Sequence, residues 1–133
     1  MSALSQVAPG RPLREGLDRI RKAGMGALIV IGDGPEVLNI SSGGFLVNAA
    51  FSPQRLSELA KTDGAIVLTP DSTYIARANV HLVPSPNVPT EETGTRHRTA
   101  ERVARSIGVP CISVAEDMAH VTVYTSHARY PLE

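Results

Sequence analysis

The sequence predicts an α/β fold in which helices flank a central mixed β-sheet, within a single domain. Short apolar runs, typical of strands buried on both faces, alternate along the chain with segments of helical periodicity. Some of these strands are joined too tightly for a helical crossover, so part of the sheet is expected to be antiparallel. A length of 133 residues suits one domain with a substantial core.

Proline, serine and glycine positions delimit the elements of the first half. Residues 1–11 are expected to be a flexible lead-in to a domain at 12–133. Pro12 favours a helix start, and Ser52 with Pro53 supplies a cap and a first helical residue. In chain order we expect a helix from Pro12 that Gly24 ends, a strand at 27–31, a short partner strand at 37–40, a short strand or loop at 45–50, and a helix from Ser52 that Asp63-Gly64 stops.

The second half is predicted in the same way. Three prolines make the stretch before Gly94 extended and irregular. In chain order we expect a strand at 65–68, one bent strand or two shorter ones at 73–83, a helix capped by Thr95 and stopped by Gly108, and two last strands at 111–114 and 121–125.

Composition narrows the function classes. The net charge is zero, with 13 basic and 13 acidic residues, which argues against bulk attraction to nucleic acid or to an anionic membrane. Cys111 is the only cysteine, so an intramolecular disulfide is excluded and a reducing compartment suits the chain. No apolar run approaches the ~20 residues of a membrane span, and the first residues lack the apolar region of a signal peptide. We therefore expect a cytoplasmic protein.

The helix that begins near Gly94 carries the wrong charges for its position. Helix starts expose free N–H groups and a partial positive charge, so they favour acidic residues. Here the first turn holds Arg96, His97 and Arg98, with Thr99 one turn after Thr95. If the helix end is only solvated, each basic residue opposes the helix dipole at a cost of roughly 0.3–1 kcal/mol, which a surface helix tolerates. A bound polyphosphate would instead be attracted by the basic side chains, the free N–H groups and the helix dipole together. Anion binding is therefore the favoured interpretation.

A second candidate site lies at Asp63-Gly64-Ala65, before a predicted strand. An Asp in such a position is often only a turn former. However, loops at strand ends are where α/β proteins bind ligands, and a small Gly-Ala pair lets a ribose or a flat ring approach the backbone. Asp63 is also suited to hold a divalent metal beside phosphates or to polarise a hydroxyl. Together the two loci suggest phosphoryl or nucleotidyl transfer.

The motifs "DGA" at Asp63-Gly64-Ala65 and "RHR" at Arg96-His97-Arg98 resemble the two signatures of diadenylate cyclase domains. The stretches "GALIVIG", "GGF", "ELAKTDGAIVL", "RANVHLVP" and "EETGTRHRTAERVA" resemble the soluble, DNA-integrity-scanning branch of that family. The similarity runs from about Leu13 to Tyr124, so the chain resembles the N-terminal catalytic domain of that branch.

The resemblance implies that two ATP molecules are converted to cyclic di-AMP and two pyrophosphates, with Mg²⁺ or Mn²⁺ as cofactor. It assigns Asp63 to metal binding and to activation of the ribose 3′-hydroxyl, and it places Leu82 near the base. Gly64 and Ala65 would line the nucleotide. The residues implied around the triphosphate are Thr95, Arg96, His97, Arg98 and Thr99.

The two-fold symmetry of the product requires two domains to meet face to face, because each ATP attacks the other. Longer members of the branch carry a DNA-binding region, so DNA contacts are expected only through regions outside this chain. We expect an isolated catalytic domain that binds ATP but cyclises it slowly, because dimerisation is weak.

One departure from the family lies in "CISVAEDMAH", where many relatives have Ser at the position of Ala115. The adjacent Glu116 is either a second metal ligand or a solvated side chain. Three rival interpretations remain: a catalytically silent nucleotide-binding module, a nucleic-acid binder that uses the basic helix start, and a purely structural domain.

Overall fold

The structure, a computed structural model, describes residues 3–116 and 120–132. Its strands are β1 (Ala27–Ile31), β2 (Ser41–Ser42), β3 (Phe45–Ala50), β4 (Ala65–Leu68), β5 (Tyr74–Leu82), β6 (Cys111–Val114), β7 (Val121–Tyr124) and β8 (Arg129–Leu132). Its helices are α1 (Ala3–Gln6), α2 (Pro12–Lys22), α3 (Pro35–Asn39), α4 (Pro53–Leu59) and α5 (Thr95–Ile107). Within this part of the chain, no helix is long and apolar enough to cross a membrane.

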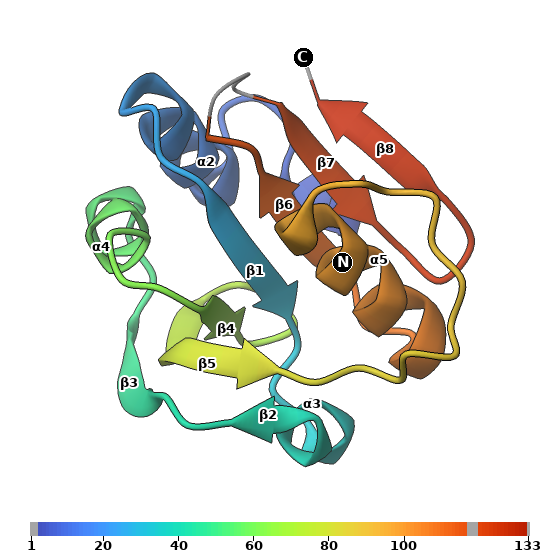
Figure 1. The fold of residues 1–133 in the computed structure, drawn as a ribbon. Helices are drawn as coiled ribbons and strands as arrows, with labels where there is room; N and C mark the ends of the chain where they lie inside the picture. Colours follow the sequence, from blue (N-terminus) through green and yellow to red (C-terminus); the bar gives the residue numbers. More distant parts are fainter. Residues whose placement is uncertain (1–2, 117–119, 133) are drawn as a thin grey trace.

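All eight strands belong to one mixed sheet, as predicted. The strand order is β2-β5-β4-β1-β6-β7-β8, and β3 also pairs with β5 (Figure 1). The pair β1–β4 is parallel, whereas β6 runs antiparallel to β1 on its other side. The carboxyl end of β6 therefore lies next to the amino ends of β1 and β4.

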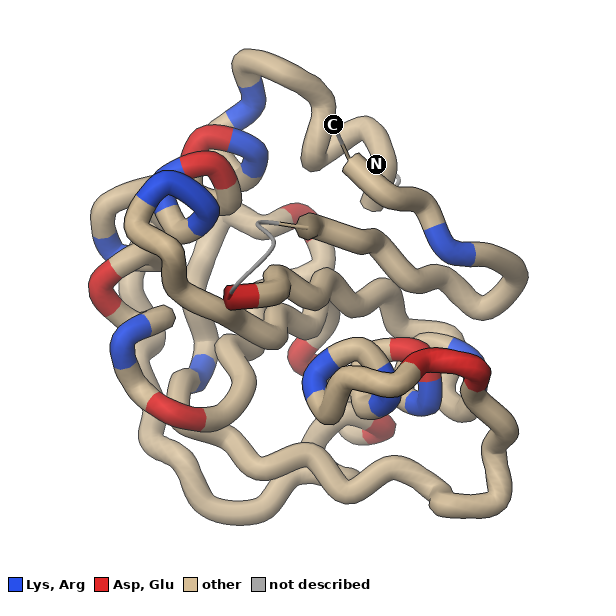
Figure 2. The backbone as a smooth tube through the Cα atoms, turned by 45° about the horizontal axis from the view of Figure 1, so that its top comes forward, with Lys and Arg blue, Asp and Glu red and all other residues tan. Residues whose placement is uncertain are grey.

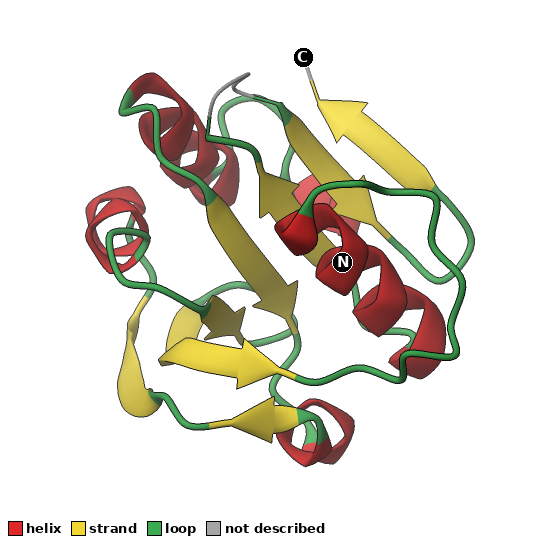
Figure 3. Cartoon of the chain, viewed as in Figure 1, coloured by secondary structure: helices red, strands yellow, loops and turns green. Residues whose placement is uncertain are grey.

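Helices cover both faces of the sheet, and the alternation of side chains along each strand divides the core into two layers. In β1, Ile29 packs with Leu17 of α2 and Leu56 of α4, whereas Val30 packs with Val103 of α5. Figure 3 shows α2 and α4 side by side, with α5 lying across β6 and β7. All five residues of β1 are buried, in agreement with its continuous apolar sequence.

Most predicted boundaries are confirmed by local geometry. The Ser52 hydroxyl accepts a hydrogen bond from the Arg55 N–H at 3.1 Å and caps α4. Gly108 ends α5 with φ 71°, in the left-handed region that glycine adopts without strain. Residues 45–50 form a strand rather than a loop. Residues 73–83 contain one strand, β5, whose register shifts against β4 and which includes Asn79 at φ 55°.

Within the lead-in at 1–11 lies α1, whose Gln6 is buried and donates a 2.9 Å hydrogen bond to the Pro70 carbonyl. Three predictions about elements were wrong. Residues 37–40 are not a strand: Pro35 starts α3, in which Val37 is buried and Leu38 is exposed. The helix at α4 ends at Leu59, before the predicted stop at 63–64. The last strand is β8, which continues a hairpin after β7.

Adjacent residues of β6 offer a test of the two layers. Ile112 is fully buried beneath α2, whereas Ser113 is fully buried on the α5 side, and its Oγ has no hydrogen-bond partner within the described residues. We expect Ile112→Ala to lower the free energy of unfolding by about 2–5 kcal/mol, through lost contacts and a cavity. Ser113→Ala should be neutral or stabilising by up to about 1 kcal/mol, because it removes an unsatisfied hydroxyl.

Urea unfolding followed by circular dichroism measures both changes. A loss of more than about 1 kcal/mol in Ser113→Ala would show that the hydroxyl has a partner and would contradict this description.

Candidate active site

The two motif segments, far apart in the sequence, line one hollow at the edge of the sheet. Asp63 lies in the turn between α4 and β4, and Arg96 is the second residue of α5. Both side chains contribute to a hollow of about 340 Å³, together with Gly26 before β1 and Glu116 after β6. The strand order brings the two motif segments together, because β1 lies between β4 and β6 in the sheet.

A second hollow, of about 680 Å³, lies at the start of α5. It is lined by Gly94, Thr95, Arg96, His97, Val114, Ala115 and Glu116. Arg96 and Glu116 line both hollows, so the two are adjacent, and we call the combined surface the motif groove. It runs from Asp63 past Arg96 to His97.

Gly64 fixes the position of Asp63. It has φ 89°, and a Cβ there would lie 2.8 Å from the carbonyl carbon of Asn79 and 2.9 Å from the Val80 oxygen. Neither backbone atom can move aside, so only glycine fits. Ala65 follows as the buried first residue of β4, paired with Leu28. The turn thus presses against β5 and leaves the Asp63 side chain exposed.

The start of α5 differs from the prediction by one residue. The N-cap is Gly94, with no side-chain capping hydrogen bond, and Thr95 is already the first helical residue. The expected capping role of Thr95 was therefore wrong, because its backbone is helical and its hydroxyl does not cap. Gly94 has no side chain to bond the first N–H groups of α5, so they face the motif groove with the positive end of the helix dipole.

Glu116 compensates the basic helix start. The Arg96 guanidinium donates to the Glu116 carboxylate at 3.0 Å, with side chains 42% and 60% exposed. Glu116 is therefore largely solvated and also paired with Arg96, a contact that neither sequence-based alternative included. An exposed pair of this kind contributes about 0–1 kcal/mol, so a stronger anion can displace the carboxylate. Figure 2 shows basic and acidic positions interspersed along the backbone, so the charge at the groove is a local feature.

Gly26 makes room for this ion pair, and sequence reasoning missed it. A Cβ at Gly26 would lie 2.6 Å from Arg96 Nη1 and 2.8 Å from Glu116 Cγ. The only sequence signal is a glycine immediately before a buried strand, which is common in α/β proteins. Its importance follows from the tertiary contact alone.

His97 is held by a second residue that sequence reasoning missed. Its Nδ1 lies 3.1 Å from the Tyr124 hydroxyl oxygen, and the two rings meet edge to face with centroids 6.3 Å apart. Tyr124 comes from β7 and is 1% exposed. A buried aromatic at the end of a strand normally indicates core packing, so the sequence gives no sign of this contact.

Several implied site residues lie away from the motif groove. Leu82 is 6% exposed and packs in the core layer with Val37 and Ile40. Arg98 is exposed on α5. Five of the site residues that the resemblance implies, all within the described part of the chain, line neither hollow of the groove: Gly64, Ala65, Leu82, Arg98 and Thr99.

Comparison with known proteins agrees with these motifs. Residues 14–128 match the DAC family, described as the DisA bacterial checkpoint controller nucleotide-binding domain. The chain is 54% identical over 132 residues to the DNA integrity scanning protein DisA of Parafrankia sp. (strain EAN1pec), covering 99% of this chain and 37% of that protein. It is 49% identical to DisA of Clostridium tetani over 132 residues, with the same coverage of 99% and 37%. The chain therefore spans a little over a third of the length of these relatives.

Solved structures share the fold. A hypothetical membrane spanning protein from Bacillus cereus superposes with a TM-score of 0.76 at 22% identity, over 91% of this chain and 61% of that chain. DacA from Staphylococcus aureus, an N166C/T172C double mutant, superposes with a TM-score of 0.68 at 22% identity, over 90% of this chain and 82% of that chain. The mixed sheet with its flanking helices is thus the architecture of these structures. With a family match over most of its length and DisA relatives at about half identity, the chain belongs to the DAC family of DisA nucleotide-binding domains.

Proposed function

We propose that this domain is a diadenylate cyclase, which converts two ATP molecules to cyclic di-AMP and two pyrophosphates. The observation that carries the proposal is that Asp63 and Arg96 line one hollow, although the motifs "DGA" and "RHR" lie in different elements. A groove with a carboxylate at one end and an uncapped helix start at the other suits a nucleoside triphosphate.

The triphosphate is proposed to lie along the start of α5. Its oxygens would accept hydrogen bonds from the first N–H groups of the helix and from Arg96, which exchanges Glu116 for a phosphate. A guanidinium pairs with phosphate oxygens by two parallel hydrogen bonds, which is stronger than the single exposed contact to Glu116. Fixed donors of this kind also stabilise charge that builds up on the departing pyrophosphate.

The residues present fit a divalent cation. Asp63 and Glu116 place two carboxylates on one hollow, and Mg²⁺ typically takes one or two carboxylates, with phosphates and water as its other ligands. We propose that Asp63 holds Mg²⁺ or Mn²⁺, with Glu116 as the second oxygen donor within reach once Arg96 has turned to phosphate. The bound cation would supply charge neutralisation and a lower pKa for the attacking 3′-hydroxyl. Asp63 would orient that hydroxyl.

Product symmetry makes a second copy of the chain part of the proposed site. One groove holds one ATP, and its 3′-hydroxyl must reach the α-phosphate of the other ATP. An isologous, face-to-face pair places two grooves in the required relation. We propose that this chain forms such a pair only weakly. Cytoplasmic location, and DNA binding through regions outside this chain, belong to the same proposal.

The alternative is a module that binds ATP without turnover. Ala115, which lines the motif groove at a position where the family resemblance implies Ser, is the feature that favours it. Its methyl group has no hydrogen-bond donor, and its backbone N–H already donates to the His120 carbonyl at 2.8 Å, so this position offers a phosphate neither a side-chain nor a free backbone donor.

Replacement of Asp63 tests the catalytic proposal. With ATP and Mn²⁺, the chain should form cyclic di-AMP at a rate that rises faster than linearly with protein concentration. Asp63→Ala should lower that rate by about 100-fold or more, because both cation and hydroxyl lose their ligand. Chromatography of the nucleotides measures the product.

Asp33→Ala is the matched control, since Asp33 lies in the loop after the opposite end of β1. Full activity of Asp63→Ala would refute its role. Absence of product from the unaltered chain, despite thermal stabilisation by ATP, would establish the silent module instead.

Replacement of Glu116 tests the exchange at Arg96. Without divalent metal, Glu116→Gln should bind ATP about two- to fivefold more tightly, because Arg96 no longer has a competing carboxylate. Calorimetric titration in EDTA measures this affinity.

Glu91→Gln makes the same change of net charge beside a different hollow and should leave the affinity unchanged. Equal effects of the two variants would show that general charge, rather than the Arg96 contact, governs binding.

A further inference from the structure

We propose that Tyr124 is a positioning residue that holds the imidazole of His97 through Nδ1 and turns its opposite edge toward the start of α5. This inference rests on the proposed function for its consequence, since that edge is where the triphosphate would lie. The contact itself is independent of any ligand.

The geometry fixes the ring from two sides. Nδ1 lies 3.1 Å from the Tyr124 hydroxyl oxygen. The opposite edge is close to Gly94, where a Cβ would stand 3.2 Å from His97 Cδ2. Tyr124 is almost fully buried in the core layer beneath α5, so it cannot follow a rotation of the imidazole.

The charge of the Glu92 carboxylate favours one direction for the hydrogen bond between Tyr124 and His97. The Glu92 carboxylate acts on the Tyr124 hydroxyl: burial, together with the charge of Glu92, raises the pKa of Tyr124, so the hydroxyl keeps its proton. A carboxylate only accepts, and a phenol has one proton to give. The charge of Glu92 favours a hydroxyl proton that points toward the carboxylate, so we expect the Tyr124 oxygen to accept from His97, with Nδ1 as the protonated nitrogen.

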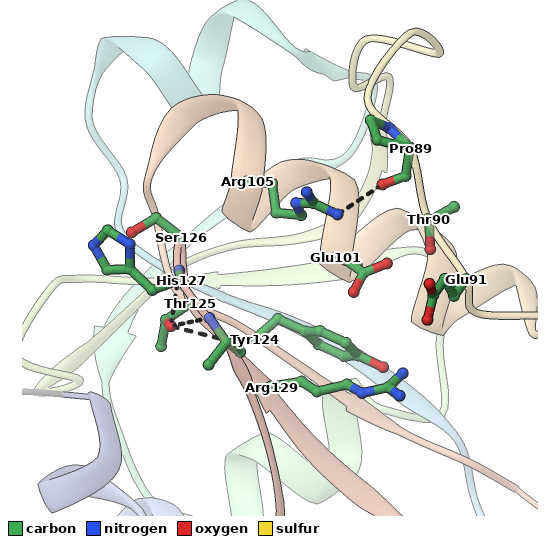
Figure 4. A pocket seen from close by; sticks show the side chains of 11 residues that line it. Pro89, Thr90, Glu91, Glu101, Arg105, Tyr124, Thr125, Ser126, His127 and Arg129 are labelled. Atoms are coloured by element: carbon green, nitrogen blue, oxygen red, sulfur yellow. Dashed lines mark hydrogen bonds between the residues drawn. The ribbon is translucent and has the colours of Figure 1, made fainter.

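Neighbouring contacts hold Glu92 in place. Its carboxylate accepts a hydrogen bond from Arg129, which lies opposite Tyr124 in the β7–β8 pair. The loop before it is tied to α5, where Arg102 and Arg105 donate to the Val88 and Pro89 carbonyls, each at 3.1 Å. Figure 4 shows the Tyr124 ring extending toward the Arg129 guanidinium in the hollow between this loop and the hairpin, which measures about 510 Å³.

The consequence concerns the other nitrogen. With Nδ1 committed to Tyr124, Nε2 remains for the motif groove, and the imidazolium form donates from both nitrogens. Without the hydroxyl, the ring is free to turn and loses its orientation toward the phosphate. Tyr124 thus orders one ligand contact from a distance, through His97.

The test uses ¹⁵N NMR of the His97 ring in the whole chain without ligand, with Tyr124→Phe as the variant. At mildly alkaline pH, Nδ1 should be protonated in the unaltered chain, and this signature should be lost in Tyr124→Phe. The affinity for ATP should fall about two- to tenfold, as expected for one hydrogen bond. KM for ATP should rise by more than kcat falls, since Tyr124 touches no reacting atom.

Two variants control the result. Tyr130→Phe makes the same change on β8, where Tyr130 is opposite Val123, and should alter neither the ring signals nor the affinity. Glu92→Gln deletes no contact to His97, but its amide can donate to the Tyr124 oxygen. It should therefore move the His97 proton toward Nε2, a readout that remains if Tyr124→Phe folds poorly.

Unchanged His97 signals in both Tyr124→Phe and Glu92→Gln would overturn the proposal. Altered signals with unchanged ATP affinity would overturn the positioning role. If the unaltered chain does not bind ATP, the proposed function fails, while the ring signals still decide whether Tyr124 holds His97.

Discussion

The antiparallel pairing of β6 with β1 is the constraint on which the motif groove depends. Ligand sites of α/β sheets usually lie at the carboxyl ends of parallel strands. Here β1 and β4 are parallel, but the groove lies at their amino ends, beside Gly26 and Asp63. The reversed β6 delivers Glu116 to that edge, and α5 starts beside it. A parallel β6 would carry Glu116 to the other edge of the sheet.

Electrostatics at this edge follow from the same arrangement. A helix start with basic residues is unfavourable alone, and the ion pair with Glu116 offsets this at modest energy. The weakness of an exposed pair matters, because a buried pair would cost several kcal/mol to break. Arg96 thus has a partner when no ligand is bound, yet it remains available to a phosphate. The backbone at Gly64 and Gly26 completes the arrangement, since a Cβ at Gly64 would meet the backbone of β5 and a Cβ at Gly26 would displace the Arg96 and Glu116 side chains.

Strands and helix caps that depend on neighbouring residues could be predicted from short stretches of the sequence. The buried strands at 27–31 and 65–68 were recognisable from continuous apolar runs, and the cap at Ser52 from its side chain. The run at 37–40 was too short for its period to separate helix from strand, and Pro35 decided the outcome. The contacts of Arg96 with Glu116, and of His97 with Tyr124, join residues 20 and 27 positions apart. Such pairs depend on strand order, which no local pattern encodes.

The most direct test of the account is an NMR map of where a non-hydrolysable ATP analogue binds. Amide signals of the ¹⁵N-labelled chain would be followed during titration with the analogue and Mg²⁺. The account predicts the largest shifts at the start of α5 and in the turn that carries Asp63, the two ends of the motif groove. Shifts confined to Thr125–Ala128, around the hollow of the β7–β8 hairpin, would contradict it.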